Sequence, residues 1–165
     1  MIPWYEEEKM ITNKEVAEPI VIDALFNNYA IPEGEIYDCK QKHLSKRIEE
    51  LGRTLVSLFY NPDLSGEYHI ISQPTWYFPQ EEIFRELERL PHGCVACFLL
   101  KSTFIGGQKR FNDLFSLYPP KLILQFARRI KCKSGYSHNF AWFIWEKGSR
   151  TEPILRWINK FTPDN

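Results

Sequence analysis

The sequence lacks the features that mark membrane-spanning, secreted or strongly basic nucleic-acid-binding proteins. No apolar run approaches the roughly 18 residues of a membrane-spanning helix. The N-terminal stretch MIPWYEEEKM is acidic and has no apolar leader segment. The chain has no net charge, because 21 basic residues balance 21 acidic ones, and this argues against a general electrostatic attraction to nucleic acid. We therefore expect a cytoplasmic protein without a membrane partner.

Cysteine is also scarce, with four residues in a chain of 165. A chain of this length has enough apolar residues to build a core without a disulfide framework. Cys94 and Cys97 have the spacing of half a zinc or redox motif. They fall within an apolar run typical of a strand, where positions i and i+3 point to opposite faces. We expect buried structural thiols and no metal site.

Aromatic residues, by contrast, are abundant at 15%, and five of them are tryptophans. With 44% apolar and 25% charged residues, the composition predicts one globular domain over residues 1–165, with residues 1–11 as an N-terminal arm. Trp4, Tyr5 and Trp157 lie near the chain ends. Packing of these rings onto the domain is the favoured interpretation, and an interface is the alternative.

The hydrophobic pattern predicts helices that alternate with strands. We expect helices over 12–28, 40–52 and 80–90, a short helix or structured loop over 106–117, strands over 35–39, 54–60, 68–72, 94–104, 121–130 and 140–148, and a last helical turn within 152–161. Pro19 is awkward inside the first helix and favours a later start. This alternation indicates a mostly parallel sheet with helices on both faces. Only a nine-residue loop, KCKSGYSHN, joins the last two strands, so these strands are expected to be antiparallel neighbours.

Three motifs follow one another in the C-terminal half: CVACFLLKSTFIGGQKRFNDLF, PPKLILQFARRIK and FAWFIWEKG. They are similar to motifs of the phage-type S-adenosylmethionine-dependent DNA adenine-N6 methyltransferases, and the resemblance covers about residues 92–158 well. The matching residues are Phe104, Ile105, Gly107, Arg110, Pro119, Pro120, Arg128 or Arg129, Ala141, Trp142, Phe143, Trp145, Glu146, Lys147 and Gly148. The resemblance implies an α/β, Rossmann-like class I methyltransferase fold, a mostly parallel sheet with a C-terminal antiparallel hairpin.

The resemblance also places the catalytic motif of that family, Asn/Asp-Pro-Pro-aromatic, on Gln73, Pro74, Thr75 and Trp76. In the family, this motif holds the target amino group and stacks on the flipped base. Two of its four positions are kept here. Gln73 is one methylene longer than asparagine, which moves its amide oxygen, and Thr75 replaces a rigid proline. The sequence therefore predicts a degenerate catalytic loop.

The family's cofactor loop, Asp-Pro-x-Cys-Gly-x-Gly, aligns with YDCKQKHLSK. Asp38 remains as the candidate cofactor-binding residue, but no glycine is kept. Glycine lets the backbone approach the cofactor closely, which other side chains obstruct. Phe59 and Tyr60 stand where the ribose-binding acid is expected, and the family's third strand has no counterpart. These losses predict a degenerate member that binds no cofactor.

The resulting hypothesis is a phage protein that acts by binding in the host cytoplasm. Its partner would be a host defence complex directed at nucleic acid, with an anti-restriction or anti-CRISPR effect. An equally open hypothesis is that the protein pairs with an active methyltransferase or regulates one. One alternative is an active DNA adenine-N6 methyltransferase that uses S-adenosylmethionine.

A second alternative is a non-catalytic protein that binds duplex DNA. Basic residues interleaved with an aromatic suit a phosphate backbone or an acidic protein surface, whereas an ordinary solvated hairpin has the same composition. The candidate nucleic-acid or partner-binding residues are Arg110, Arg128, Arg129, Lys131, Lys133 and Tyr136. The oligomeric state is left open.

Overall fold

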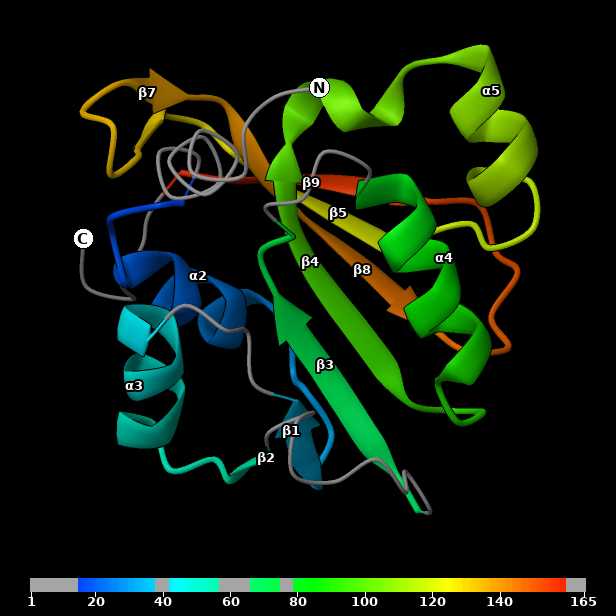
Figure 1. Cartoon of the computed structure of the whole chain (residues 1–165), viewed down its shortest axis with the longest axis horizontal. Helices are drawn as coiled ribbons and strands as arrows, with labels where there is room; N and C mark the ends of the chain where they lie inside the picture. Colours follow the sequence, from blue (N-terminus) through cyan, green and yellow to red (C-terminus); the bar gives the residue numbers. More distant parts are fainter. Residues whose placement is uncertain (1–14, 38–41, 57–65, 75–78, 160–165) are drawn as a thin grey trace, which may run out of the picture.

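The computed structural model describes residues 15–37, 42–56, 66–74 and 79–159. Helices and strands alternate along most of the chain, as the sequence predicts (Figure 1). Their order is α2 (Ile20–Asn28), β1 (Glu35–Tyr37), α3 (Lys42–Glu50), β2 (Leu55–Val56), β3 (Tyr68–Ser72), α4 (Pro79–Arg89), β4 (Val95–Lys101), the 3₁₀ turn η1 (Ser102–Ile105), α5 (Gln108–Arg110), the π-helical turn η2 (Phe111–Phe115), β5 (Leu122–Phe126), β6 (Ile130–Lys131), β7 (Ser137–His138), β8 (Phe140–Glu146) and β9 (Ile154–Ile158).

Seven strands form the central sheet in the order β2-β1-β3-β4-β8-β5-β9. The pairs β1–β2, β1–β3, β3–β4 and β5–β9 are parallel. Strand β8 lies between β4 and β5 and runs antiparallel to both. The sheet is therefore mostly parallel, and the predicted antiparallel pairing of the last two strands is confirmed.

The strand order reverses direction beside β1. The chain passes from β1 through α3 to β2 on one side, whereas β3 lies on the other side and leads through α4 to β4. Such a reversal is a topological switch point, and ligands of open α/β sheets bind outside the carboxyl ends of the strands there. The architecture is a Rossmann-like α/β fold with a mostly parallel sheet. In the part of the chain that the structure describes, β2 ends this side of the sheet.

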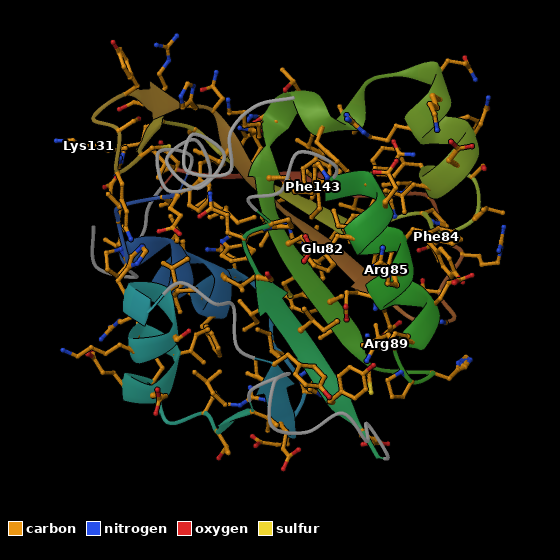
Figure 2. The ribbon with its side chains drawn as sticks, viewed as in Figure 1. Glu82, Phe84, Arg85, Arg89, Lys131 and Phe143 are labelled. Carbon is orange, nitrogen blue, oxygen red and sulfur yellow. The ribbon has the colours of Figure 1, made fainter. Side chains whose placement is uncertain are left out.

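Both faces of the sheet are covered, so its strands are near-continuous apolar runs. Helices α2 and α3 cover one face, and α4, η1 and η2 cover the other (Figure 1). The Nε1 of the buried Trp142 donates a hydrogen bond to the Val21 carbonyl, 2.9 Å away, and so joins β8 to α2. Phe143 points into the opposite layer (Figure 2). Cys94 and Cys97 are buried in opposite layers, which confirms that they cannot share a ligand.

Three predicted elements are corrected by the structure. The first described helix begins at Ile20 rather than at residue 12 or 13, the later start that Pro19 favours, because proline suits the start of a helix and not its interior. The predicted strand 121–130 ends at Phe126, and β6 and β7 form a separate small hairpin. The segment 152–161, predicted as a helical turn, contains strand β9. No described helix is both long and apolar enough to span a membrane.

Candidate functional site

The candidate site lies at the carboxyl ends of the parallel strands, next to the switch point. Gln73 and Pro74 follow β3 directly, and Lys101 is the last residue of β4. Helix α3 begins shortly after β1 ends. Because these strands are parallel neighbours, their ends come together at one edge of the sheet.

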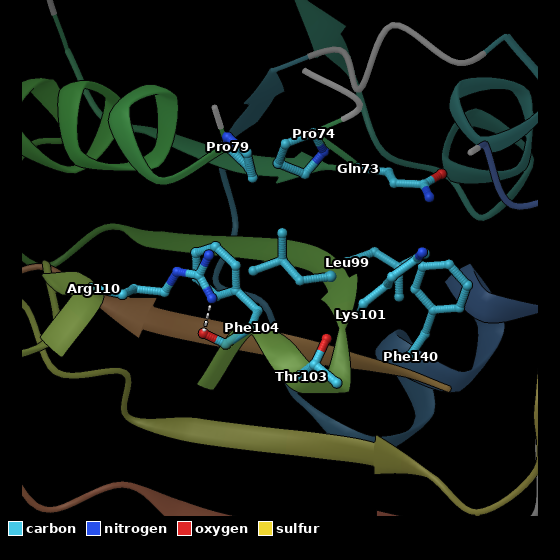
Figure 3. A pocket seen from close by; sticks show the side chains of 10 residues that line it. Gln73, Pro74, Pro79, Leu99, Lys101, Thr103, Phe104, Arg110 and Phe140 are labelled. Carbon is cyan, nitrogen blue, oxygen red and sulfur yellow. Dashed lines mark hydrogen bonds between the residues drawn. The ribbon is translucent and has the colours of Figure 1, made fainter. Parts of the chain in front are cut away.

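A cavity of about 260 Å³ opens at this edge. Arg110 and Lys101 lie toward opposite ends of it, and Leu99 and the ring of Phe104 lie between them (Figure 3). The complete lining is Gln73, Pro74, Pro79, Leu99, Leu100, Lys101, Thr103, Phe104, Arg110 and Phe140. The cavity therefore combines an apolar wall with two cationic groups.

Arg110 is held in place by the turn before it. Gly107 has a φ of 111°, a conformation that favours glycine, and the chain then turns into α5. The Nη1 of Arg110 donates to the carbonyl oxygens of Phe104 at 2.8 Å and Gly106 at 3.2 Å. The guanidinium lies 4.0 Å from the centre of the Phe104 ring. Burial lowers the pKa of Arg110, and the side chain forms a fixed wall of the cavity.

The amide of Gln73 is engaged in a contact far along the chain. Gln73 is only 4% exposed. Its Oε1 accepts a hydrogen bond of 2.9 Å from the backbone N–H of Val16, 57 residues away. In Figure 3 the Gln73 side chain extends along the rim, away from Arg110. The amide oxygen that would hold a substrate amino group is thus used inside the protein.

Val16 belongs to a segment, Glu15–Glu18, that we call the strap. The Nε2 of His43, at the start of α3, donates a hydrogen bond to the Val16 carbonyl. The Val16 side chain is completely buried in the core. Both backbone polar groups of Val16 are therefore bound, one by the residue after β3 and the other by the first turn of the helix after β1. The strap crosses the switch point.

The strap is also joined to the β6–β7 hairpin through its backbone. Val16 forms an isolated antiparallel bridge with Cys132. The N–H of Ala17 donates to the Lys131 carbonyl, and the N–H of Lys133 donates to the Glu15 carbonyl, both at 2.8 Å. The strap therefore acts as a short third strand of the hairpin.

The two acidic residues of the strap neutralise part of the basic hairpin. The Glu18 carboxylate accepts hydrogen bonds from Arg128 at 2.9 and 3.2 Å and from the backbone N–H of Lys131 at 2.8 Å. Glu15 forms an ion pair of 2.6 Å with Lys133. The hydrogen bond from Arg128 lowers the pKa of Glu18. Half of the basic hairpin that the sequence predicted is thus committed to internal ion pairs.

The other basic side chains of the hairpin and its tyrosine face solvent. Arg129 and Lys131 are exposed, and Tyr136 is 74% exposed. Figure 2 shows Lys131 projecting outward from the hairpin. Burial, with the positive charges of Lys101 and Arg129, lowers the pKa of His138. The positive potential therefore extends from the hairpin toward the end of β4.

The structure brings the predicted site residues together in two groups. Gln73, Pro74 and Arg110 line the cavity, and the other basic residues and Tyr136 lie on or beside the hairpin. Asp38, Thr75 and Trp76, with the positions of Phe59 and Tyr60, lie outside the described residues. Sequence reasoning missed the residues that join the two groups. These are Glu15, Val16, Glu18, His43 and Lys101.

No known family model and no curated protein matches the sequence. Among solved structures, one similar chain is a Listeria monocytogenes protein assigned to the class I S-adenosylmethionine-dependent methyltransferases. Its identity to this chain is 15% and the TM-score is 0.48, and the match covers 97% of this chain. The match spans 64% of the length of the Listeria chain. Another is an Agrobacterium tumefaciens protein described as an O-methyltransferase, with 11% identity, a TM-score of 0.47 and 84% of each chain covered. At this level of similarity, the two structures support no conclusion about the activity of this chain.

Proposed function

We propose that this protein is a methyltransferase-fold protein that has lost methyl transfer and acts by binding. The observation that carries the proposal is the hydrogen bond from the Val16 N–H to the Oε1 of Gln73. A catalytic amide must be available to the substrate within a fraction of an ångström of the productive geometry. Here the amide oxygen satisfies a buried backbone group, and freeing it would leave that N–H without its acceptor.

The strap also opposes a cofactor at this position. The described residues do not suit S-adenosylmethionine, because Val16 lies at the switch point between the start of α3 and the end of β3 and is bonded to both. Close approach of a backbone to a ligand at such a turn calls for glycine, and the sequence from Asp38 to His43 contains none. We infer that the chain's own strap takes the place of the cofactor.

The proposed partner is a host protein complex that acts on nucleic acid in restriction or CRISPR defence. This part of the proposal depends on the resemblance of residues 92–158 to a phage-type family and on the absence of net charge. A neutral chain suits contact with a protein surface better than a general attraction to DNA. The partner-facing candidates are Arg129, Lys131 and Tyr136, which the hairpin exposes.

Binding to duplex DNA is a second candidate, favoured by the same exposed residues. Neutralisation of Arg128 and Lys133 by the strap leaves few cations for phosphates. A DNA-binding protein would show an affinity that falls steeply with salt. It would lose that affinity in an Arg129→Ala/Lys131→Ala variant more than in the matched Arg128→Ala variant, because Arg128 is already paired with Glu18.

The test of the proposal is a methyl-transfer assay on the full chain. The protein is incubated with tritiated S-adenosylmethionine and unmodified duplex DNA, beside an active DNA adenine methyltransferase as positive control. We expect no label in the DNA. Incorporation of label that depends on this protein and is abolished by Gln73→Ala would overturn the proposal in favour of the enzyme.

A further inference from the structure

Strand β9 lies at an edge of the central sheet, next to β5. Alternate residues of β9 form the backbone hydrogen bonds to β5. The N–H of Ile154 donates to Lys121, and the carbonyl of Ile158 accepts from Ala127. In a parallel ladder the intervening residues, Leu155 and Trp157, direct their backbone groups away from the neighbouring strand. Among the described strands, none pairs with this outer edge.

The edge is apolar as well as unpaired. Ile154 is 58% exposed, Leu155 46% and Trp157 67%. Its one charged residue is Arg156. Proteins usually protect an edge strand with charge, proline or a covering element, because an open apolar edge pairs readily with another strand. The sequence-based preference for packing Trp157 onto the domain is therefore wrong, because most of its side chain faces solvent.

A second apolar surface continues from the start of β9. A groove of about 250 Å³ is lined by Ile105, Phe111, Phe115, Pro119, Pro120 and Pro153. Ile105 and Phe111 are each 54% exposed. Pro153 directly precedes β9, and Leu155 pairs with Ile123, which belongs to the same core layer as Phe115. The groove and the side chains of Leu155 and Trp157 thus lie on one side of the sheet.

The area is of the size that a modest dimer uses. Four roughly half-exposed side chains lie on this side of the sheet, those of Ile105, Phe111, Leu155 and Trp157. At ~200 Å² each, they present on the order of 400 Å² of surface. A standard interface buries about 800 Å² on each partner. The unpaired backbone of β9 adds to this surface. A patch of this size is comparable to the largest apolar patch of a typical monomer, and such patches are often functional.

We propose that two copies of this chain pair antiparallel through β9 and form one continuous sheet. In the two-fold register that we propose, Trp157 faces Trp157 of the second copy. Leu155 then faces Asn159, and Arg156 faces Ile158. A register centred on Arg156 would oppose like charges. A register centred on Leu155 would require an N–H from Pro153, which has none.

The first test is sedimentation of the full chain over about 1 to 100 µM, the range expected for a dimer of modest affinity. We expect a concentration-dependent dimer that Trp157→Lys reduces at least tenfold in affinity. The matched control is Tyr136→Lys, which changes an aromatic residue of similar exposure on the hairpin and is expected to leave the dimer intact. A monomer throughout the range would overturn the proposal, as would a dimer equally weakened by both changes.

The second test concerns the register. In the proposed pairing, residues 155 and 159 of the two copies face each other as a hydrogen-bonded pair with Cα atoms about 5.5 Å apart, within the range of a disulfide. Leu155→Cys/Asn159→Cys is therefore expected to give a covalent dimer under oxidising conditions, whereas each single variant does not. A non-covalent dimer that fails to cross-link in the double variant would refute this register.

Discussion

The Oε1 of Gln73 lies 2.9 Å from the backbone nitrogen of Val16 and accepts its hydrogen bond. This contact joins the end of β3 to a segment that precedes the first described helix. The end of β3 is at the sheet edge where open α/β folds bind their ligands. On its other side, Val16 is bonded to His43, and the strap continues into the hairpin through its bridge to Cys132. Gln73, the residue predicted as catalytic, thus also holds the strap across the switch point.

Replacement of Gln73 by alanine is expected to destabilise the protein by about 1–3 kcal/mol, because the buried N–H of Val16 loses its acceptor. Urea unfolding measures the change. The matched control is Gln108→Ala, which removes an exposed amide and its hydrogen bond to Asn112 and is expected to change stability by less than ~0.5 kcal/mol. Equal effects of the two substitutions would contradict the structural role of Gln73.

Glu18 is expected to make the attachment of the strap depend on pH. Its pKa is lowered in the folded protein, chiefly by the hydrogen bond from Arg128. A carboxyl with a depressed folded pKa contributes stability above its unfolded pKa and loses that contribution as the pH falls through the folded value. Glu18→Gln should therefore destabilise the protein near pH 7 and have a vanishing effect in acid, below the usual carboxyl range.

The source of that shift can be checked separately by NMR titration of the Glu18 carboxyl. In an Arg128→Ala variant we expect its pKa to rise toward the ordinary value of 4.5. Lys109→Ala serves as the control, because it removes an exposed cation that pairs with Asp113. A Glu18 pKa that does not respond to the loss of Arg128 would show that the ion pair does not form in solution.

His138 reports the positive potential beside the cavity. Burial lowers its pKa first, and Lys101 and Arg129 lower it further. Removal of one of these charges in Lys101→Ala or Arg129→Ala is expected to raise the His138 pKa, with burial keeping it below the ordinary 6.5. NMR titration of the imidazole measures it. Because the folded pKa is depressed, protonation of His138 opposes folding, and stability should decrease as the pH falls below about 6.5.

The fold could be predicted from the sequence wherever one strong signal dominated. Residues 94–104 and 140–148 are near-continuous apolar runs, which buried strands require, and the short loop between the last two strands allowed only an antiparallel connection. β9 was missed because its apolar residues suit either a short helix or a strand. Its assignment depends on pairing with β5, which no local pattern encodes.

The site could be predicted only in part. The motif around Gln73 indicated the sheet edge at which the cavity lies, and the basic residues indicated the hairpin. The strap could not be predicted, because Glu18 and Arg128 are 110 residues apart in the chain. Two acids three positions apart are ordinary on any solvated segment. Only the folded backbone shows that they neutralise the hairpin and that Val16 occupies the switch point.

The most direct measurement of the central claim is a calorimetric titration of the full chain with S-adenosylmethionine, beside an active S-adenosylmethionine-dependent methyltransferase as positive control. If the strap takes the place of the cofactor, the titration gives no binding heat, and the cofactor does not raise the melting temperature. Saturable binding with a dissociation constant of ~10 µM or tighter, about −7 kcal/mol, would contradict the account.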